Sequence, residues 1–311
     1  MWVKNSLIIT LENFRIVWRV LLYILVLVLI IGGISVAFLR VPLKEFAAEL
    51  SHTDVLSNFK IVVTNLIIGN TSSQEYIEAA TNLGVGFEQI KIILTAYSRN
   101  ITITTIAVIF VGILTSLLIN MAQYPMIDMA NSYMNSAAKS KFTMSLFKSF
   151  GKALVFELSR FIIVFPAFVI FGGIIYLIMK HFSFLGVFSL PAIFLILIGA
   201  IALGQTILNF WLPTILIKNL RPFAALKSAV GMVKGNFSRL FSNYIVVDTV
   251  GYVLIMVSSF ITFGIAPLVL FPAIQLYISN YKNVSTYHKF QLRYYIDGMN
   301  VIDPSKIYEI E

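Results

Sequence analysis

The chain has no cysteine among its 311 residues and few charged residues, 12% of the total. Without cysteine there can be no disulfide framework, thiolate zinc site, iron–sulfur cluster or cysteine nucleophile. The sequence also lacks the nucleophile elbow G-x-S-x-G, a Walker-type glycine loop, the zinc motif H-E-x-x-H and paired glycosidase carboxylates. An enzyme is therefore disfavoured, and no cofactor is expected.

Apolar residues make up 59% of the chain, and its mean hydropathy is +0.89. A membrane-spanning helix needs about 20 apolar residues, and six apolar runs of about that length occur. Asp248 is the one charged residue within them. The sequence thus predicts an all-α, multi-pass membrane protein. The six predicted spans are 20–39, 101–123, 161–179, 184–210, 244–260 and 263–280. The first is read as a retained span, because it is too long for a signal peptide.

The basic residues predict how the chain is oriented. Segments on one side of the six spans hold 17 Lys and Arg, and those on the other side hold 6. The positive-inside rule then places both termini in the cytoplasm of a cell-membrane protein. This distribution explains the net charge of +9 without nucleic acid. The predicted parts are a cytoplasmic amphipathic segment 1–19, a membrane domain 20–280 with an outer loop 40–100 and basic inner loops 124–160 and 211–243, and a cytoplasmic tail 281–311.

Three inner segments have the pattern of basic amphipathic helices on the membrane surface. Each has an apolar stripe at helical spacing with cations off that stripe. Packing over the inner mouth of the bundle would use the same residues, so both alternatives stay open. The stripes are Leu7, Leu11, Phe14 and Trp18; Phe142, Leu146, Phe150 and Leu154; and Phe223, Leu226, Val230, Val233, Phe237 and Leu240. The cations expected to contact lipid headgroups of the anionic inner leaflet, or a partner, are Lys148, Lys152, Lys227, Lys234 and Arg239.

Matching prolines indicate an internal repeat. Pro125, Pro213 and Pro272 each stand near the inner end of an even-numbered span. Pairs of small residues in the odd-numbered spans, such as Gly32-Gly33 and Gly172-Gly173, suggest close helix approach. We therefore expect three repeated helical hairpins. In the outer loop, helical spacing over 43–68 and 74–98 with a turn at Gly69 predicts one more hairpin, outside the membrane.

The stretch Pro222-Phe223-Ala224-Ala225-Leu226-Lys227-Ser228, followed by Val233-Lys234-Gly235-Asn236-Phe237 and Arg239-Leu240-Phe241, resembles the membrane domain of glycerophosphodiester phosphodiesterases and related six-span bacterial membrane proteins. The resemblance implies a six-span fold over about 20–300. The phosphodiesterase chemistry of that family belongs to a separate soluble domain. The thirty or so residues after 281 are too few for it, so the resemblance implies a stand-alone membrane module.

Asp248 is the strongest single candidate for a functional residue, because placing an acid inside a membrane helix costs about 2.5–3.5 kcal/mol on insertion scales. It either couples to transport or pairs at the inner interface with a cation such as Arg239 or Lys218. Amides on the inner halves of the even spans either line a cytoplasm-facing cavity with Asp248 or join helices by hydrogen bonds. They are Asn120, Gln123, Gln205, Asn209 and Gln275.

Structural roles are expected for the other ionisable residues. His52, His181 and His288 fall in separate parts of the predicted topology, so no histidine metal site is expected. Asp128 and Glu157, the latter close to Arg160, are predicted to form interfacial ion pairs.

The sequence favours two functional hypotheses. The first is a non-enzymatic module that contacts lipids or a partner protein, for example in envelope homeostasis or secretion. The second is a transporter or permease component, in which the segment 221–241 would dock on a cytosolic ATPase. An intramembrane hydrolase is a third and weaker hypothesis.

Overall fold

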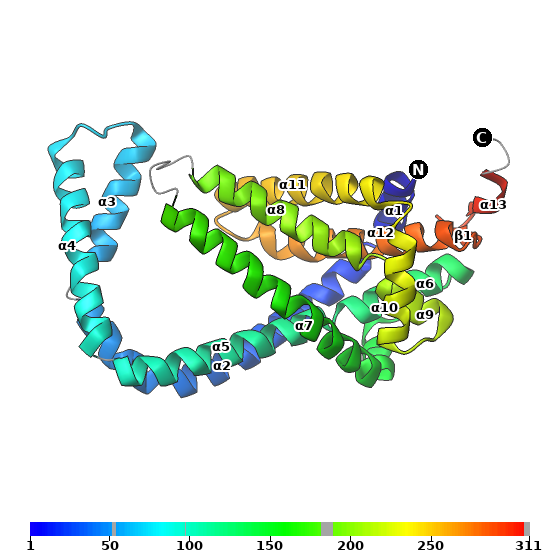
Figure 1. The fold of residues 1–311 in the computed structure, drawn as a ribbon, viewed down its shortest axis with the longest axis horizontal. Helices are drawn as coiled ribbons and strands as arrows, with labels where there is room; N and C mark the ends of the chain where they lie inside the picture. The colour runs from blue at the N-terminus through cyan, green and yellow to red at the C-terminus, as the bar shows by residue number, and fades with distance from the viewer. Residues whose placement is uncertain (52–53, 97, 182–188, 308–311) are drawn as a thin grey trace. The chain divides into compact units, whose positions relative to one another are not determined.

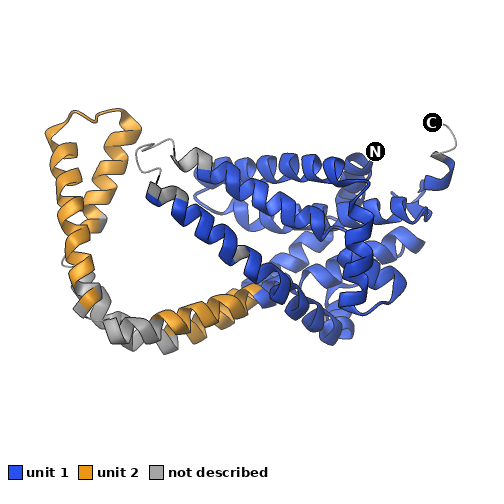
Figure 2. Ribbon diagram, viewed as in Figure 1, with its two compact units in different colours: residues 1–25, 117–311 blue, residues 26–116 orange. Residues whose placement is uncertain are grey.

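The computed structural model describes residues 1–51, 54–96, 98–181 and 189–307. These residues form a nearly all-α protein whose short strands are confined to the C-terminal end (Figure 1). The chain divides into two compact units, one of residues 1–25 and 117–311 and one of residues 26–116 (Figure 2). The all-α prediction is therefore confirmed.

The second unit, residues 26–116, contains the predicted outer hairpin. Helix α2 (Arg15–Ser51) ends in it, α3 (Val55–Ile68) and α4 (Gln74–Ala96) pack against each other, and α5 (Ser98–Asn120) leaves it. Gly69 ends α3 with φ +76°, a left-handed conformation that glycine adopts without steric cost. The turn was predicted correctly. The first hairpin helix begins later than predicted, because residues 43–51 continue α2.

The first unit holds the remaining helices. Helix α1 (Trp2–Glu12) precedes α2, and a break at residues 121–122 separates α5 from α6 (Gln123–Ser136). A second break, at residues 208–210, separates α8 (Ser189–Ile207) from α9 (Trp211–Lys218). The others are α7 (Phe142–His181), α10 (Pro222–Val233), α11 (Phe237–Ile261), α12 (Ala266–Lys289) and α13 (Pro304–Ile307), with strands β1 (Tyr294–Tyr295) and β2 (Val301–Ile302) paired antiparallel.

Five helical segments within the described residues are long and apolar enough to cross a membrane. They are Arg15–Val36, Thr105–Ser136, Phe142–Leu177, Ile193–Lys218 and Phe237–Ile261. Only 6% of the most apolar window of the first lies buried within the protein, so lipid must cover the rest. Six spans are not confirmed, since α12 is not among the five. Its prolines and its polar residues from Gln275 onward make it less apolar than the others.

The C-terminal half of α12 forms the centre of the first unit. Residues 278–288 are buried with the single exception of Lys282. Helix α1 packs along this segment, and α6, α9 and α11 also contact it. The segment 281–311, predicted as a tail, thus begins inside the best-packed helix. Asn5 Nδ2 donates to Tyr294 Oη at 2.7 Å, so α1 contacts β1, the strand that follows α12. Figure 1 shows α1 beside α12.

The predicted surface helices are found with different limits. Helix α10 begins at Pro222 as expected but ends at Val233, and Phe237 and Leu240 belong to α11. The stripe Leu7 to Trp18 is divided between α1 and α2. The stripe from Phe142 to Leu154 is not a separate helix, because α7 runs unbroken for 40 residues into the third span.

Small-residue pairs do not mark helix contacts here. A Cβ built on Gly32, Gly33, Gly172 or Gly173 meets no atom within 4 Å, so that expectation is wrong at these four positions. The prolines also differ from one another. Pro125 and Pro213 are each the third residue of a short helix after a break, whereas Pro272 lies inside a continuous helix. The triplicated hairpin stays a prediction.

Gly251 of α11 is where two helices of the bundle approach closely. A Cβ there would lie 3.2 Å from Ile274 Cδ1 of α12. We expect Gly251→Val to destabilise the protein by about 1–3 kcal/mol, because the added methyl groups overpack this contact. Gly204→Val is the matched control, since a Cβ at Gly204 meets nothing within 4 Å. Thermal unfolding in detergent measures both, and equal effects would contradict the proposed contact.

Candidate functional site

An ion pair between a buried carboxylate and a partly exposed guanidinium lies on α7. The side chain of Glu157 is 0% exposed, and Arg160 Nη2 lies 2.7 Å from Glu157 Oε2. The two residues are three apart, a spacing that brings side chains together on one helix face. The prediction that Glu157 is paired is confirmed. Asp128, in contrast, accepts a hydrogen bond from Ser145 Oγ at 2.7 Å and forms no ion pair with another described residue.

Asp248 of α11 is nearly buried and faces α8. Its Oδ1 accepts a hydrogen bond from Gln205 Nε2 at 3.2 Å. Neither predicted cation partners it. The Arg239 guanidinium stacks on the Trp2 ring at 4.1 Å, and Lys218 Nζ lies 4.2 Å from the centre of the Phe290 ring.

Lys282 of α12 joins these two groups electrostatically. Its charge interacts with those of Arg160, Glu157 and Asp248. Lys282 is half-buried, and its loss of hydration together with the charge of Arg160 lowers its pKa to about 8, against the opposing effect of the two carboxylates. From the sequence, Lys282 was counted as one more cation of the predicted tail. Its position was the overlooked clue, because Lys282 stands only two residues beyond the last predicted span.

We call Glu157, Arg160, Gln205, Asp248 and Lys282 the charged cluster. Four helices contribute to it: α7, α8, α11 and α12. With Lys282 charged, its two carboxylates and two cations balance. Burying unbalanced charge costs several kcal/mol per ion even after relaxation, so this balance lowers the cost of placing the carboxylates inside the bundle.

The predicted amides separate into three groups. Asn120, Gln123 and Gln275 line one cavity of about 20 Å³, the room that about one water needs. Gln205 binds Asp248. Asn209 accepts a 2.6 Å hydrogen bond from Tyr244 Oη and donates a 2.9 Å hydrogen bond to Ser285 Oγ. The structure thus does not bring the six residues together around one cavity, although all six lie in the first unit.

A network of hydrogen bonds around α12 was missed by sequence reasoning. Asn280 Nδ2 donates to Thr10 Oγ1 of α1, and Asn283 Nδ2 donates to the carbonyl oxygen of Ile127 in α6, both at 2.9 Å. Tyr287 Oη bonds Asn131 of α6. A clue was the density of Asn, Ser, Thr and Tyr over 277–288. In the folded protein these residues hold three helices together.

His288 lies where the two chain ends meet. Its Nε2 is 2.9 Å from Tyr294 Oη, and its ring lies against Trp2. Burial, and to a smaller extent the charges of Arg239 and the N-terminal ammonium, lower the pKa of His288 to about 4. His52 lies outside the described residues. Within the part of the chain that the structure describes, no group of three His, Asp or Glu is placed to hold a metal ion.

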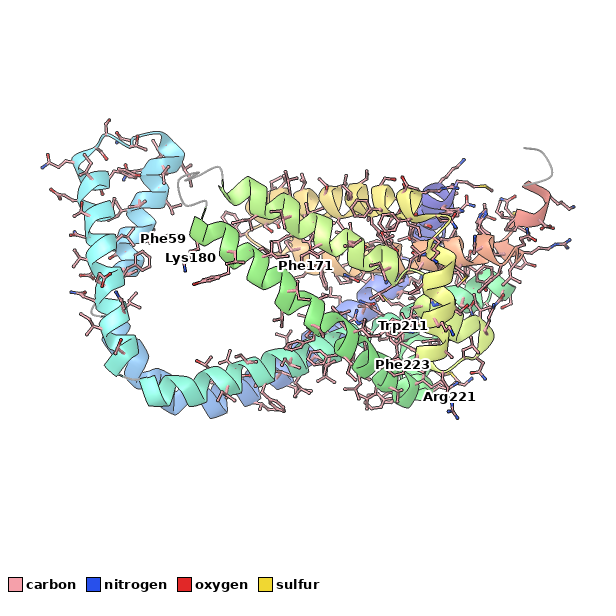
Figure 3. The ribbon with its side chains drawn as sticks, in the orientation of Figure 1. Phe59, Phe171, Lys180, Trp211, Arg221 and Phe223 are labelled. Carbon is pink, nitrogen blue, oxygen red and sulfur yellow. The ribbon has the colours of Figure 1, made fainter. Side chains whose placement is uncertain are left out.

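The five predicted headgroup contacts, Lys148, Lys152, Lys227, Lys234 and Arg239, are all exposed. Large apolar side chains beside them are exposed too. Phe147 of α7 is 78% exposed, and Phe223 of α10 is 59% exposed (Figure 3). The three tryptophans of the chain differ in exposure. Trp2 and Trp211 are buried in the core, and only Trp18 is exposed.

Comparisons with protein-family models, with curated proteins and with solved structures gave no match to this chain. The resemblance to the membrane domain of glycerophosphodiester phosphodiesterases therefore stays a prediction from residues 222–241. The functional argument rests on the chain's own geometry.

Replacing Arg160 tests the buried ion pair. We expect Arg160→Met to destabilise the protein by roughly 3–5 kcal/mol, because Glu157 is then a buried charge without its partner. The double variant Glu157→Gln with Arg160→Met should recover most of that loss. Lys152→Met, an exposed lysine of the same helix, is the control. If Arg160→Met matches the control in thermal unfolding, the pair does not stabilise the fold.

Acidification tests His288. The unfolded chain takes up its proton near pH 6.5 and the folded chain only near pH 4, so stability is lost as the pH falls through this window. The pKa difference corresponds to about 3 kcal/mol. We expect His288→Gln to remove this loss, while Lys289→Gln, an exposed neighbour, keeps it. Parallel pH curves for the wild type and His288→Gln would show that the imidazole is not held neutral.

Proposed function

We propose that this chain is a non-enzymatic multi-pass membrane protein whose basic inner face binds anionic lipid headgroups. The observation that carries the proposal is the exposure of large apolar side chains on α1 and α10. Leu11 is 64% exposed and Phe223 is 59% exposed, although each is part of a folded, well-packed unit. Large apolar side chains placed this way beside cations are typical of helices lying at a membrane surface.

Helix α1 illustrates the choice between surface and core. The face that packs on the protein includes the polar residues Asn5, Ser6 and Thr10, together with Trp2 and Ile9. The apolar residues Leu7 and Leu11 point away from it. Were α1 only a cover on the bundle, its apolar stripe would face the bundle. The opposite arrangement favours lipid as the surroundings of that stripe.

Helix α10 repeats the arrangement. It packs through Ala225, Ala229 and Val233, whose small size lets the helix lie close to its neighbours, while Phe223 and Val230 stay exposed. Trp211 Nε1 donates to the carbonyl oxygen of Pro222 at 2.7 Å, fixing the corner between α9 and α10 (Figure 3). The exposed cations Lys227 and Lys234 flank the stripe, where they are suited to phosphate groups.

The meeting of the chain ends supports six crossings with both termini inside. Helix α1 and the segment after α12 are in contact, so they lie on the same side of any membrane that the helices cross. An even number of crossings is then needed, which gives α12 the role of the sixth. This side also carries 17 of the 23 Lys and Arg, in agreement with the positive-inside rule.

A lipid-binding measurement tests the proposal. Wild-type protein in mild detergent is titrated with phosphatidylglycerol or phosphatidylcholine, and bound lipid is counted by native mass spectrometry. We expect phosphatidylglycerol to bind at least about fivefold more tightly, the equivalent of about 1 kcal/mol for one cation near an anionic surface. The variant with Lys148, Lys152, Lys227 and Lys234 changed to Gln should lose this preference.

Lys60→Gln with Lys91→Gln is the matched control, because both lysines are exposed but belong to the other unit. Arg239 is left unchanged, since its guanidinium packs on Trp2 and its loss would disturb the core. A quadruple variant that still prefers phosphatidylglycerol, or a wild type with no preference, would contradict the proposal.

A further inference from the structure

Two oxygen atoms of one hydrogen-bonded pair in the charged cluster lack a donor. Asp248 Oδ1 accepts from Gln205 Nε2, but Asp248 Oδ2 and Gln205 Oε1 are both buried without a hydrogen-bond partner among the described residues. Leaving a buried acceptor unpaired is unfavourable, because it has given up water and gained nothing in return. Both atoms are acceptors, so neither can satisfy the other.

One proton resolves both deficits. A carboxylic acid has a donor that a carboxylate lacks, and an acid and a primary amide can pair through two hydrogen bonds. With a proton on Asp248 Oδ2, the acid donates to Gln205 Oε1 while Gln205 Nε2 continues to donate to Asp248 Oδ1. No other added group is needed to complete the pair.

We propose that Asp248 and Gln205 form a proton-binding site at the inner end of the bundle, with the proton as its ligand. The carboxylate takes one proton from hydronium and leaves water, and the new O–H bond makes Asp248 neutral. This function is separate from the lipid binding proposed above. The two are carried by different residues and can fail independently.

The protonation of Asp248 affects the protonation of Lys282. Lys282 of α12 and Asp248 of α11 attract each other, so neutralising Asp248 removes a charge that favours the protonated lysine. Proton uptake at Asp248 thus promotes proton release from Lys282. The other charges that act on Lys282 are Glu157 and Arg160 of α7. Around Asp248 itself the titratable groups are Lys282 of α12 and the tyrosines Tyr244 and Tyr252 of α11.

The proposal predicts an unusual result for Asp248→Asn. An asparagine at this position can pair with Gln205 through both hydrogen bonds, as the protonated acid does, at every pH. The variant should therefore unfold at a higher temperature than the wild type at pH 8, by roughly 2–4 °C. The difference should shrink towards zero at pH 5, where the wild type is protonated. The change in His288 protonation is common to both proteins and cancels in the comparison.

Two further variants serve as controls. Asp248→Leu loses both hydrogen bonds and should unfold below the wild type at either pH. Asp128→Asn changes an acid of α6 that is bound to Ser145, and its difference from the wild type should not depend on pH in this way. If Asp248→Asn unfolds below the wild type at both pH values, Asp248 acts as a fixed structural charge and the proposal is wrong.

Infrared difference spectroscopy detects the proton directly. Spectra of the wild type at pH 5 minus pH 8 should contain the C=O stretch of a buried carboxylic acid, shifted in heavy water. The band should be lost in Asp248→Asn, retained in Asp128→Asn and moved in Gln205→Met, which removes the amide partner. A band that persists in Asp248→Asn, or no band in the wild type, would overturn the assignment.

Discussion

The structure depends on satisfying the polar side chains of α12 without bulk water. Each unpaired polar group in such a place is costly, and the inner half of this helix carries many of them. Asn280 and Asn283 find partners on α1 and α6, and Ser285 binds Asn209. These bonds connect segments far apart in sequence, so they fix the N-terminal helix, the end of the second predicted span and the chain end as one body. The lipid-facing helices are held in place through this centre.

Sequence reasoning was most successful where periodicity and apolar length decide the structure. It predicted the all-α class, the outer turn at Gly69, the start of α10 at Pro222 and the pairing of Glu157 with Arg160. These features depend on residues close together in the chain. The first and fifth spans were placed nearly as found, and the third overlaps the longer segment Phe142–Leu177. Helix α12 was divided at residue 280, because its polarity there resembled that of a tail.

What could not be predicted depends on partners brought together by the fold. Arg239 was assigned to Asp248 or to headgroups, yet it stacks on Trp2, 237 positions away in the chain. Asp248 itself binds Gln205, and the amides expected around one cavity divide among three groups. Helical spacing tells which face of its own helix a residue occupies, but not which other helix lies opposite. Lys282 was overlooked for the same reason.

The position of the charged cluster explains how buried charge and lipid contact can coexist in one small bundle. Towards the bilayer the helices present apolar side chains, and no counter-charge would be available there. At the inner end the hydrogen-bonded centre around α12 supplies amides, hydroxyls and a cation, so Asp248 has partners in either protonation state. Its site joins α8 to α11, the most extensively packed pair of spans in the first unit. A change in the charge of Asp248 therefore acts where α8 and α11 pack together.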